Sequence, residues 1–341
     1  MMTEPIRKKY QPTDWKTITK NVYIYVLLLF IVFIFSVIKL DQVEMFGRGN
    51  FLSADSIINL LRSAIPIITL GGGFTLIMIS GHIDLSVGSQ MGLSAVVYSW
   101  LAINGFPFLI AFAATAILGI VMGFINGFFV VRLRITPVIA TLVNLNLFKG
   151  IALLIVPNGV SAIKSSTTVK MPDWINNYGR KDFLLGLPVA FYVAILVIII
   201  LFIVQRKTII GKYSAAIGGN RTAAELSGIN AKKMVWLLYI IMGILAAVAG
   251  IARASYMSLG DPLSGDGMET DCIIAVLLGG TAFTGGSGSV LKTIIGALII
   301  VCMTTGLMTV IPPYYQILAK SLVLIMAVTI NRLLDSPKVK A

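Results

Sequence analysis

The sequence has one histidine and two cysteines, and these shortages exclude several kinds of site. His82 stands alone, so a metal centre built on several histidines is excluded. Cys272 and Cys302 lie in apolar segments without paired metal-ligand spacing, so we expect buried free thiols. No GxSxG or HExxH motif occurs, and Leu291 precedes Lys292 where a phosphate-binding loop needs glycine. We therefore expect no enzymatic activity, no bound ATP, no metal and no cofactor.

Charged residues are also scarce. They make up 12% of the 341 residues, whereas soluble domains carry about 25%, and 57% of the chain is hydrophobic. This composition predicts an all-α polytopic membrane protein with a single transmembrane domain over 1–341, because backbone polar groups in lipid must be satisfied within helices. The net charge of +13 does not indicate nucleic acid, because the basic residues lie at the edges of apolar runs, where they can contact lipid headgroups.

About ten apolar stretches are candidates for membrane spans, each of which needs roughly 20 residues. The eighth is short and rich in glycine, so we expect it to be tilted or broken. The candidates are 22–40, 57–79, 85–103, 107–131, 137–156, 187–204, 234–257, 272–283, 290–310 and 314–333.

The distribution of Lys and Arg predicts the orientation of these spans. The segments expected inside hold 17 basic residues and those expected outside hold 6, which places both termini in the cytoplasm of a multi-pass protein of the bacterial cell (inner) membrane. The inside segments are the cytoplasmic N-terminal segment 1–21, then 132–136, 205–233, 284–293 and 332–341.

Two stretches of the chain resemble each other. Leu70–Gly73 followed by SGHIDLSVGS (80–89) is similar to LLGGTAFTGGSGS (277–289), since each joins small residues to a turn rich in glycine and serine and then to an apolar helix. Transporter folds often contain such repeats, so an internal inverted repeat is possible. Chance similarity between glycine-rich segments is the alternative.

The polar segment 205–233 carries six basic residues and one acid, Glu225. Within it we expect a short helix over 220–228, because Asn220 can cap its start and Gly228 can end it. Small, exposed side chains at Ala223 and Ala224 would let another protein approach closely. We interpret 205–233 as a cytoplasmic coupling loop that a separate motor protein binds.

Five polar residues within or beside the apolar runs are candidates for a substrate path. Asp84 and Ser86 lie between two spans. Asp84 caps or packs against the helix that starts near residue 85, or lines the path, and these roles are compatible. Asn126, Asn144 and Asn146 could bind a polyhydroxylated solute, since amides both donate and accept hydrogen bonds. Interhelical hydrogen bonding is the alternative role for these amides.

Four motifs in order along the chain resemble the permease subunits of ribose-type sugar ABC importers, the importers of ribose, xylose, arabinose and galactose. The similarity extends over about 57–330. TAAELSG (222–228) also resembles the importer loop EAA-x-x-x-G, with Thr222 at the glutamate position, whereas the family commonly has a smaller residue where His82 stands. The four motifs are SGHIDLSVGS (80–89), RITPVIATL (134–142), IGGNRTAAELSGIN (217–230) and LGGTAFTGGSGSVLKTIIGAL (278–298).

The resemblance implies a function and several partners. The chain would be the permease that translocates a small sugar, such as a pentose, a hexose or a furanosyl compound like autoinducer-2. A second permease chain, identical or paralogous, would complete the membrane core, and an extracytoplasmic solute-binding protein would deliver the sugar. A separate cytoplasmic ATPase would drive transport by docking on Asn220, Thr222, Ala223, Ala224, Glu225 and Gly228.

Two alternatives belong to other functional classes. An ion-gradient-driven secondary transporter of a small polar solute would favour paired acids within the membrane, and beyond Asp84 the sequence shows little of that. A channel or a purely structural subunit is the third reading, and saturable, ATP-dependent uptake would exclude it.

Overall fold

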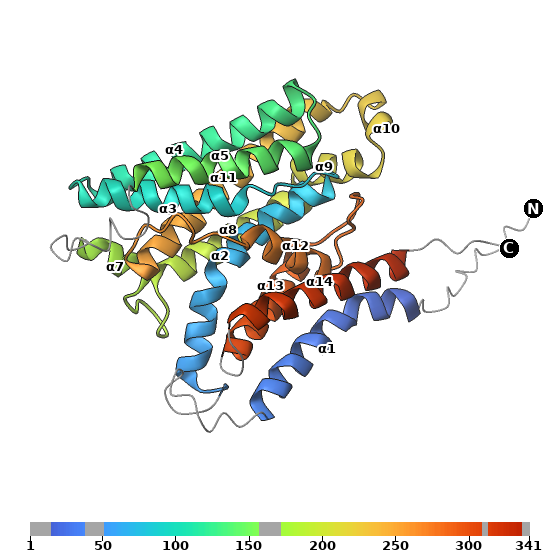
Figure 1. The fold of residues 1–341 in the computed structure, drawn as a ribbon. Coiled ribbons are helices and arrows are strands. Elements are labelled where there is room, and N and C mark those ends of the chain that lie inside the picture. The colour runs from blue at the N-terminus through green and yellow to red at the C-terminus, as the bar shows by residue number, and fades with distance from the viewer. Residues whose placement is uncertain (1–14, 38–50, 157–171, 309–312, 336–341) are drawn as a thin grey trace, which may run out of the picture.

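A computed structural model describes residues 15–37, 51–156, 172–308 and 313–335 (Figure 1). Within these ranges the chain is helical apart from turns and one isolated bridge between Leu184 and Leu187, which confirms the expected all-α class. The helices are α1 (Trp15–Val37), α2 (Ala54–Ile79), α3 (Val87–Ile103), α4 (Phe108–Gly127), the π-helix η2 (Phe128–Arg132), α5 (Pro137–Ile155), α7 (Asp173–Gly179), α8 (Val189–Lys207), α9 (Ile209–Gly219), α10 (Arg221–Leu226), α11 (Ala231–Met257), α12 (Met268–Leu278), α13 (Val290–Met308) and α14 (Pro313–Asp335).

Each of the ten expected spans overlaps one of these helices. Within the described ranges, six helices are long and apolar enough to cross a membrane, namely α2, α4 with η2, α5, α8, α11 and α13. Helix α12 has 11 residues, as expected of the short eighth candidate, and α3 has 17. Crossing by all ten stays a prediction, as does the cytoplasmic side of the termini, because 1–14 and 336–341 lie outside the described residues.

Helices α2 and α11 form the centre of the bundle. Helix α11 packs against α4, α3 and α2, and α2 packs against α13 and α8. Ser53 caps the start of α2, and Pro66 lies inside it, where the missing N–H and the ring disturb the helical hydrogen bonds. Figure 1 shows α2 changing direction near its middle.

Helices α4 and α11 approach each other closely through glycine. A Cβ atom on Gly123 would lie 2.3 Å from the carbonyl oxygen of Tyr239, and one on Gly243 would lie 2.1 Å from that of Gly119. Small residues permit such backbone contact, which drives helix association in lipid because apolar burial alone does not favour it there.

The segment 205–233 is more ordered than the expected loop. Between the end of α8 and the start of α11 it forms two helices, α9 and α10, and only the second was anticipated. In Figure 1, α9 and α10 lie at one end of the bundle, whereas α7 lies at the other. Helix α10 protrudes from the bundle.

The contact between α4 and α11 generates a stability prediction. Gly123→Ala should lower the thermal stability of the purified protein, since overpacking costs about 1–3 kcal/mol. Gly150→Ala on α5 is the matched control, because no atom lies within 4 Å of the added methyl group. Thermal unfolding in detergent, followed by size-exclusion chromatography, measures both variants. An equal effect of the two substitutions would contradict the close contact.

Candidate functional site

Helix α10 begins and ends at the residues that the sequence indicates. The side-chain oxygen of Asn220 accepts a hydrogen bond from the backbone N–H of Ala223 at 3.0 Å, which is an N-cap. Gly228 has φ +84°, and the N–H of Ile229 donates to the carbonyl of Ala224 at 3.1 Å, as in a Schellman C-terminus. The expected helix is therefore confirmed, including both of its terminal signals.

The exposure of this helix corrects one expectation. Ala224 is 5% exposed and packs with Ile217, Ala231 and Met234, so it was wrong to expect an exposed small residue there. One side of so short a helix must face the protein, and Ala224 lies on that side. Ala223 is exposed as expected, and so is Leu226, which sequence reasoning missed, with 85% of its surface accessible.

Thr222 and Glu225 also lie on the exposed side of α10. The Nε atom of Arg221 donates to Glu225 at 3.1 Å across one helical turn. Both side chains are about half exposed, and surface pairs of this kind contribute about 0–1 kcal/mol. Helix α10 thus presents a mixed surface with one large apolar side chain.

Helix α9 joins this exposed helix to the membrane bundle through backbone contacts. A Cβ atom on Gly218 would lie 1.9 Å from the carbonyl oxygen of Ile79, at the end of α2, and 2.6 Å from the backbone nitrogen of Gly286. The N–H of Gly286 itself donates to Ile79 at 2.7 Å. The breaks that follow α2 and α12 therefore meet each other and the end of α9. These breaks are the two stretches whose sequences resemble each other, although the internal repeat stays a prediction.

Asp84 lies at the centre of a buried polar cluster in the break between α2 and α3. Its carboxylate accepts hydrogen bonds from the N–H of Ser86 at 2.9 Å and from the hydroxyl of Ser86 at 2.6 Å. The side-chain amides of Gln90 and Asn126 donate to the other oxygen at 3.0 and 3.1 Å. All four residues are 0% exposed.

Asp84 is therefore not the N-cap of the helix that follows. Helix α3 begins at Val87 with Ser86 as its N-cap, and Asp84 instead holds the turn just before it. These contacts describe a packing role, and a path role for Asp84 stays a prediction. Donors from α3 and α4 meet at this carboxylate, so it ties the break to two helices.

The structure places two of the three candidate asparagines in the polar cluster and the third outside it. Asn144 on α5 is buried and donates to Asn126 at 2.6 Å, which extends the cluster to a third helix. Asn146 is exposed and donates to the carbonyl of Leu142 on its own helix, so it does not join the cluster. The assignment of these residues to a substrate path stays a prediction.

Two further hydrogen bonds stabilise the break between α2 and α3. The hydroxyl of Tyr239 on α11 donates to the carbonyl of Ile83 at 3.0 Å, and the N–H of Leu85 donates to the hydroxyl of Thr141 at 3.1 Å. Sequence reasoning missed Tyr239, Thr141 and Gln90. A polar residue one turn after Ser86 on the same helix was the available signal for Gln90.

His82 occupies the solvent-side edge of this break. One of its ring nitrogens lies 2.9 Å from the carbonyl oxygen of Ser80, so this histidine has a hydrogen-bond partner. Burial lowers the pKa of His82, and the charge of Arg221 acts in the same direction, while the hydrogen bond to Ser80 opposes them. The imidazole is consequently neutral near pH 7.

Two lysines within apolar helices pair with carboxylates. Lys320 on α14 lies 2.9 Å from Asp271 on α12, and Lys149 on α5 lies 2.7 Å from Asp266 in the turn before α12. Paired charges are the usual state of ionisable groups at membrane depth.

Among the described residues, no group of three or more His, Cys, Asp and Glu is placed to hold a metal.

Comparison with known proteins assigns the family. Residues 56–328 match the family described as the permease component of the branched-chain amino acid transport system, and the chain therefore belongs to that family of transport permeases. It is a membrane-embedded permease subunit and not an enzyme.

Curated relatives indicate which kind of transport permease the chain resembles. The chain is 33% identical to the ribose import permease of Haemophilus influenzae over 85% of this chain and 88% of the relative. It is 33% identical to the xylose transport permease of the same organism over 93% and 97% of the two chains. It is 34% identical to the galactofuranose transporter permease of Escherichia coli over 79% and 77%. The resemblance to ribose-type sugar ABC permeases is thus confirmed.

The polar cluster generates the second prediction. Asp84→Ala removes the carboxylate that accepts hydrogen bonds from Ser86, Gln90 and Asn126, so it should destabilise the protein by about 1–3 kcal/mol, the cost of leaving a buried donor unsatisfied. Ser94→Ala removes a buried hydroxyl that has no hydrogen-bond partner and should cost far less. Chemical denaturation in detergent compares the two. Equal destabilisation would contradict a holding role for Asp84.

Proposed function

We propose that this chain is the transmembrane permease subunit of an ATP-binding cassette importer and that it carries a small sugar into the cell. The named cargoes of the relatives, ribose, xylose and galactofuranose, support a pentose, a hexose or a related furanosyl compound such as autoinducer-2. A separate cytoplasmic ATPase supplies the energy, and a second permease chain completes the membrane core.

The observation that carries this proposal is the construction of α10. A single exposed leucine is common on protein surfaces. Leu226, however, stands at the end of a capped helix that protrudes from the bundle, and α10 is joined through α9 to the end of α2 and to the break that follows α12 (Figure 1). A protein that binds α10 can therefore displace the break that follows α2 and the break that follows α12. Docking of the ATPase on α10 accounts for the caps at both ends of so short a helix.

The opposite end of the bundle offers a surface for an extracytoplasmic solute-binding protein. A recess of about 470 Å³ is lined by Arg62, Arg180, Tyr256 and Met257. Arg62 pairs with Asp182 and donates to the carbonyl of Gly186, so it helps to hold the chain that follows α7. Arg180 donates to Ser258 and is exposed. A basic recess on this face favours a partner with acidic groups.

Leu226→Asp tests the coupling role. The tagged chain is coexpressed with the ATPase of the same transport system and solubilised in mild detergent, and the retained ATPase and its hydrolysis rate are measured. We expect retention to fall at least tenfold, because a charge replaces an apolar contact that a docked partner would desolvate. Leu185→Asp is the control, since Leu185 is 80% exposed at the opposite end of the chain's fold.

Two outcomes would count against the proposal. Equal retention by the Leu226 and Leu185 variants would remove α10 from the docking surface. Wild-type uptake that needs no ATPase and collapses with an ion gradient would favour the secondary transporter instead, with the pair Lys320–Asp271 as its first candidate for a charged site.

A further inference from the structure

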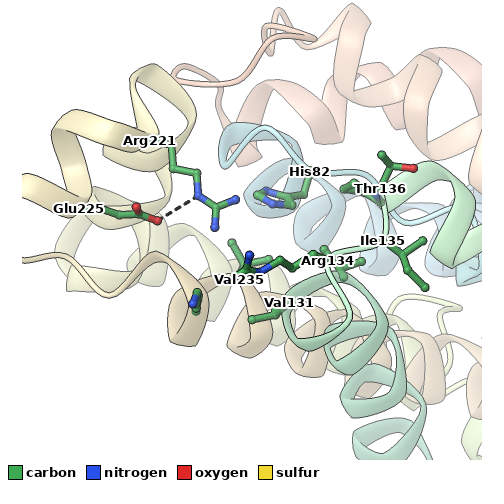
Figure 2. A pocket seen from close by; sticks show the side chains of 11 residues that line it. His82, Val131, Arg134, Ile135, Thr136, Arg221, Glu225 and Val235 are labelled. Carbon is green, nitrogen blue, oxygen red and sulfur yellow. Dashed lines mark hydrogen bonds and ion pairs between the residues drawn. The ribbon is translucent and has the colours of Figure 1, made fainter.

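A pocket of about 490 Å³ lies beside α10, outside the polar cluster (Figure 2). Its walls come from the break after α2, from η2 with the connection to the start of α5, from helix α10 and from the first turns of α11. The lining residues are His82, Val130, Val131, Arg134, Ile135, Thr136, Pro137, Arg221, Glu225, Lys232 and Val235. The pocket therefore joins the exposed helix to elements that enter the membrane bundle.

Three cationic side chains from three elements line this pocket. Arg134 comes from the η2–α5 connection, Arg221 from α10 and Lys232 from α11. Figure 2 shows Arg221 directed from α10 toward His82, with Glu225 on the side of its Nε atom. The terminal nitrogens of that guanidinium stay available for a ligand, because the ion pair with Glu225 uses Nε.

The charge of the pocket selects the chemistry of its ligand. Three cations and the single lining acid, Glu225, give a net charge of about +2 with His82 neutral. A phosphate monoester carries about −1.5 to −2 at pH 7 and offers three strong acceptor oxygens. Guanidinium groups match phosphate geometry with paired N–H donors. A carboxylate would neutralise only about half of this charge.

The remaining wall indicates that the phosphate carries an organic group. Val130, Val131, Ile135 and Val235 form an apolar side of the same pocket. An isolated inorganic anion would leave this side in contact with water alone. A phosphate ester can place its charged end against Arg134, Arg221 and Lys232 and its organic part against the valines.

We propose that this pocket binds the phosphate group of an organic phosphate ester and thereby clamps α10 to the η2–α5 connection and to α11. The ester is a monoester, either the headgroup of phosphatidic acid or a soluble phosphorylated metabolite, since both present the same dianionic phosphate group. Occupancy would restrict the movement of α10 relative to the bundle. This inference concerns a ligand other than the transported solute, and its binding test does not require transport.

The test measures binding to the full-length chain in two arms. In the soluble arm, protein in phosphatidylcholine nanodiscs is titrated with glycerol 3-phosphate by calorimetry, with glycerol as the uncharged control. In the lipid arm, native mass spectrometry measures retention of phosphatidic acid from mixed micelles. Binding in the first arm identifies a soluble ester, and binding confined to the second identifies a lipid.

Matched double variants separate the pocket from general surface charge. Arg134→Gln with Lys232→Gln should weaken binding at least tenfold. Arg132→Gln with Lys233→Gln removes the same charge from neighbouring exposed positions that do not line the pocket, and should change binding less than twofold. If the first double variant does not fold, Lys232→Gln alone is compared with Lys233→Gln. Equal losses in the pair, or no saturable binding of either probe to the wild type, would overturn the proposal.

Discussion

The structure depends on one contact in which three backbone segments touch without side chains between them. The N–H of Gly286 donates to the carbonyl of Ile79 at 2.7 Å, and Gly218 lies so close to the same carbonyl that no Cβ could fit. Protein interiors transmit displacement because close-packed atoms cannot compress. A force applied to α10 and α9 must therefore move the end of α2 and the break that follows α12. Glycine at these positions makes that mechanical connection possible.

The other side of the same break is fastened by polar groups. The carboxylate of Asp84 accepts hydrogen bonds from side chains on α3 and α4. The hydroxyl of Tyr239 on α11 donates to the carbonyl of Ile83. Buried polar networks with several satisfied members hold a unique arrangement, because each broken bond leaves a desolvated group behind. The break between α2 and α3 is thus held between α9 and the centre of the bundle. It is a suitable place for two discrete conformations of a transporter.

The ends of α10 were predictable from the sequence, whereas the burial of side chains by packing between distant segments was not. Asn220 and Gly228 mark the ends of α10 because capping depends on a few neighbouring residues. The burial of Ala224 depends on α9 and α11, which no local pattern places. Asn144 and Asn146 could have been separated in advance, since two residues along a helix turn it by about 200° and cannot share a face. Their different environments follow from that phase.

The measurement that tests this account most directly is the amount of ATP hydrolysed per solute imported in proteoliposomes holding the permease, its ATPase and its binding protein. Gly218→Ala inserts a methyl group into the three-segment contact, whereas Gly219→Ala, the next residue, meets no atom within 4 Å. The account predicts that Gly218→Ala raises the ATP cost of each imported molecule severalfold while Gly219→Ala leaves it unchanged. Wild-type coupling in both variants would show that force does not pass through this contact.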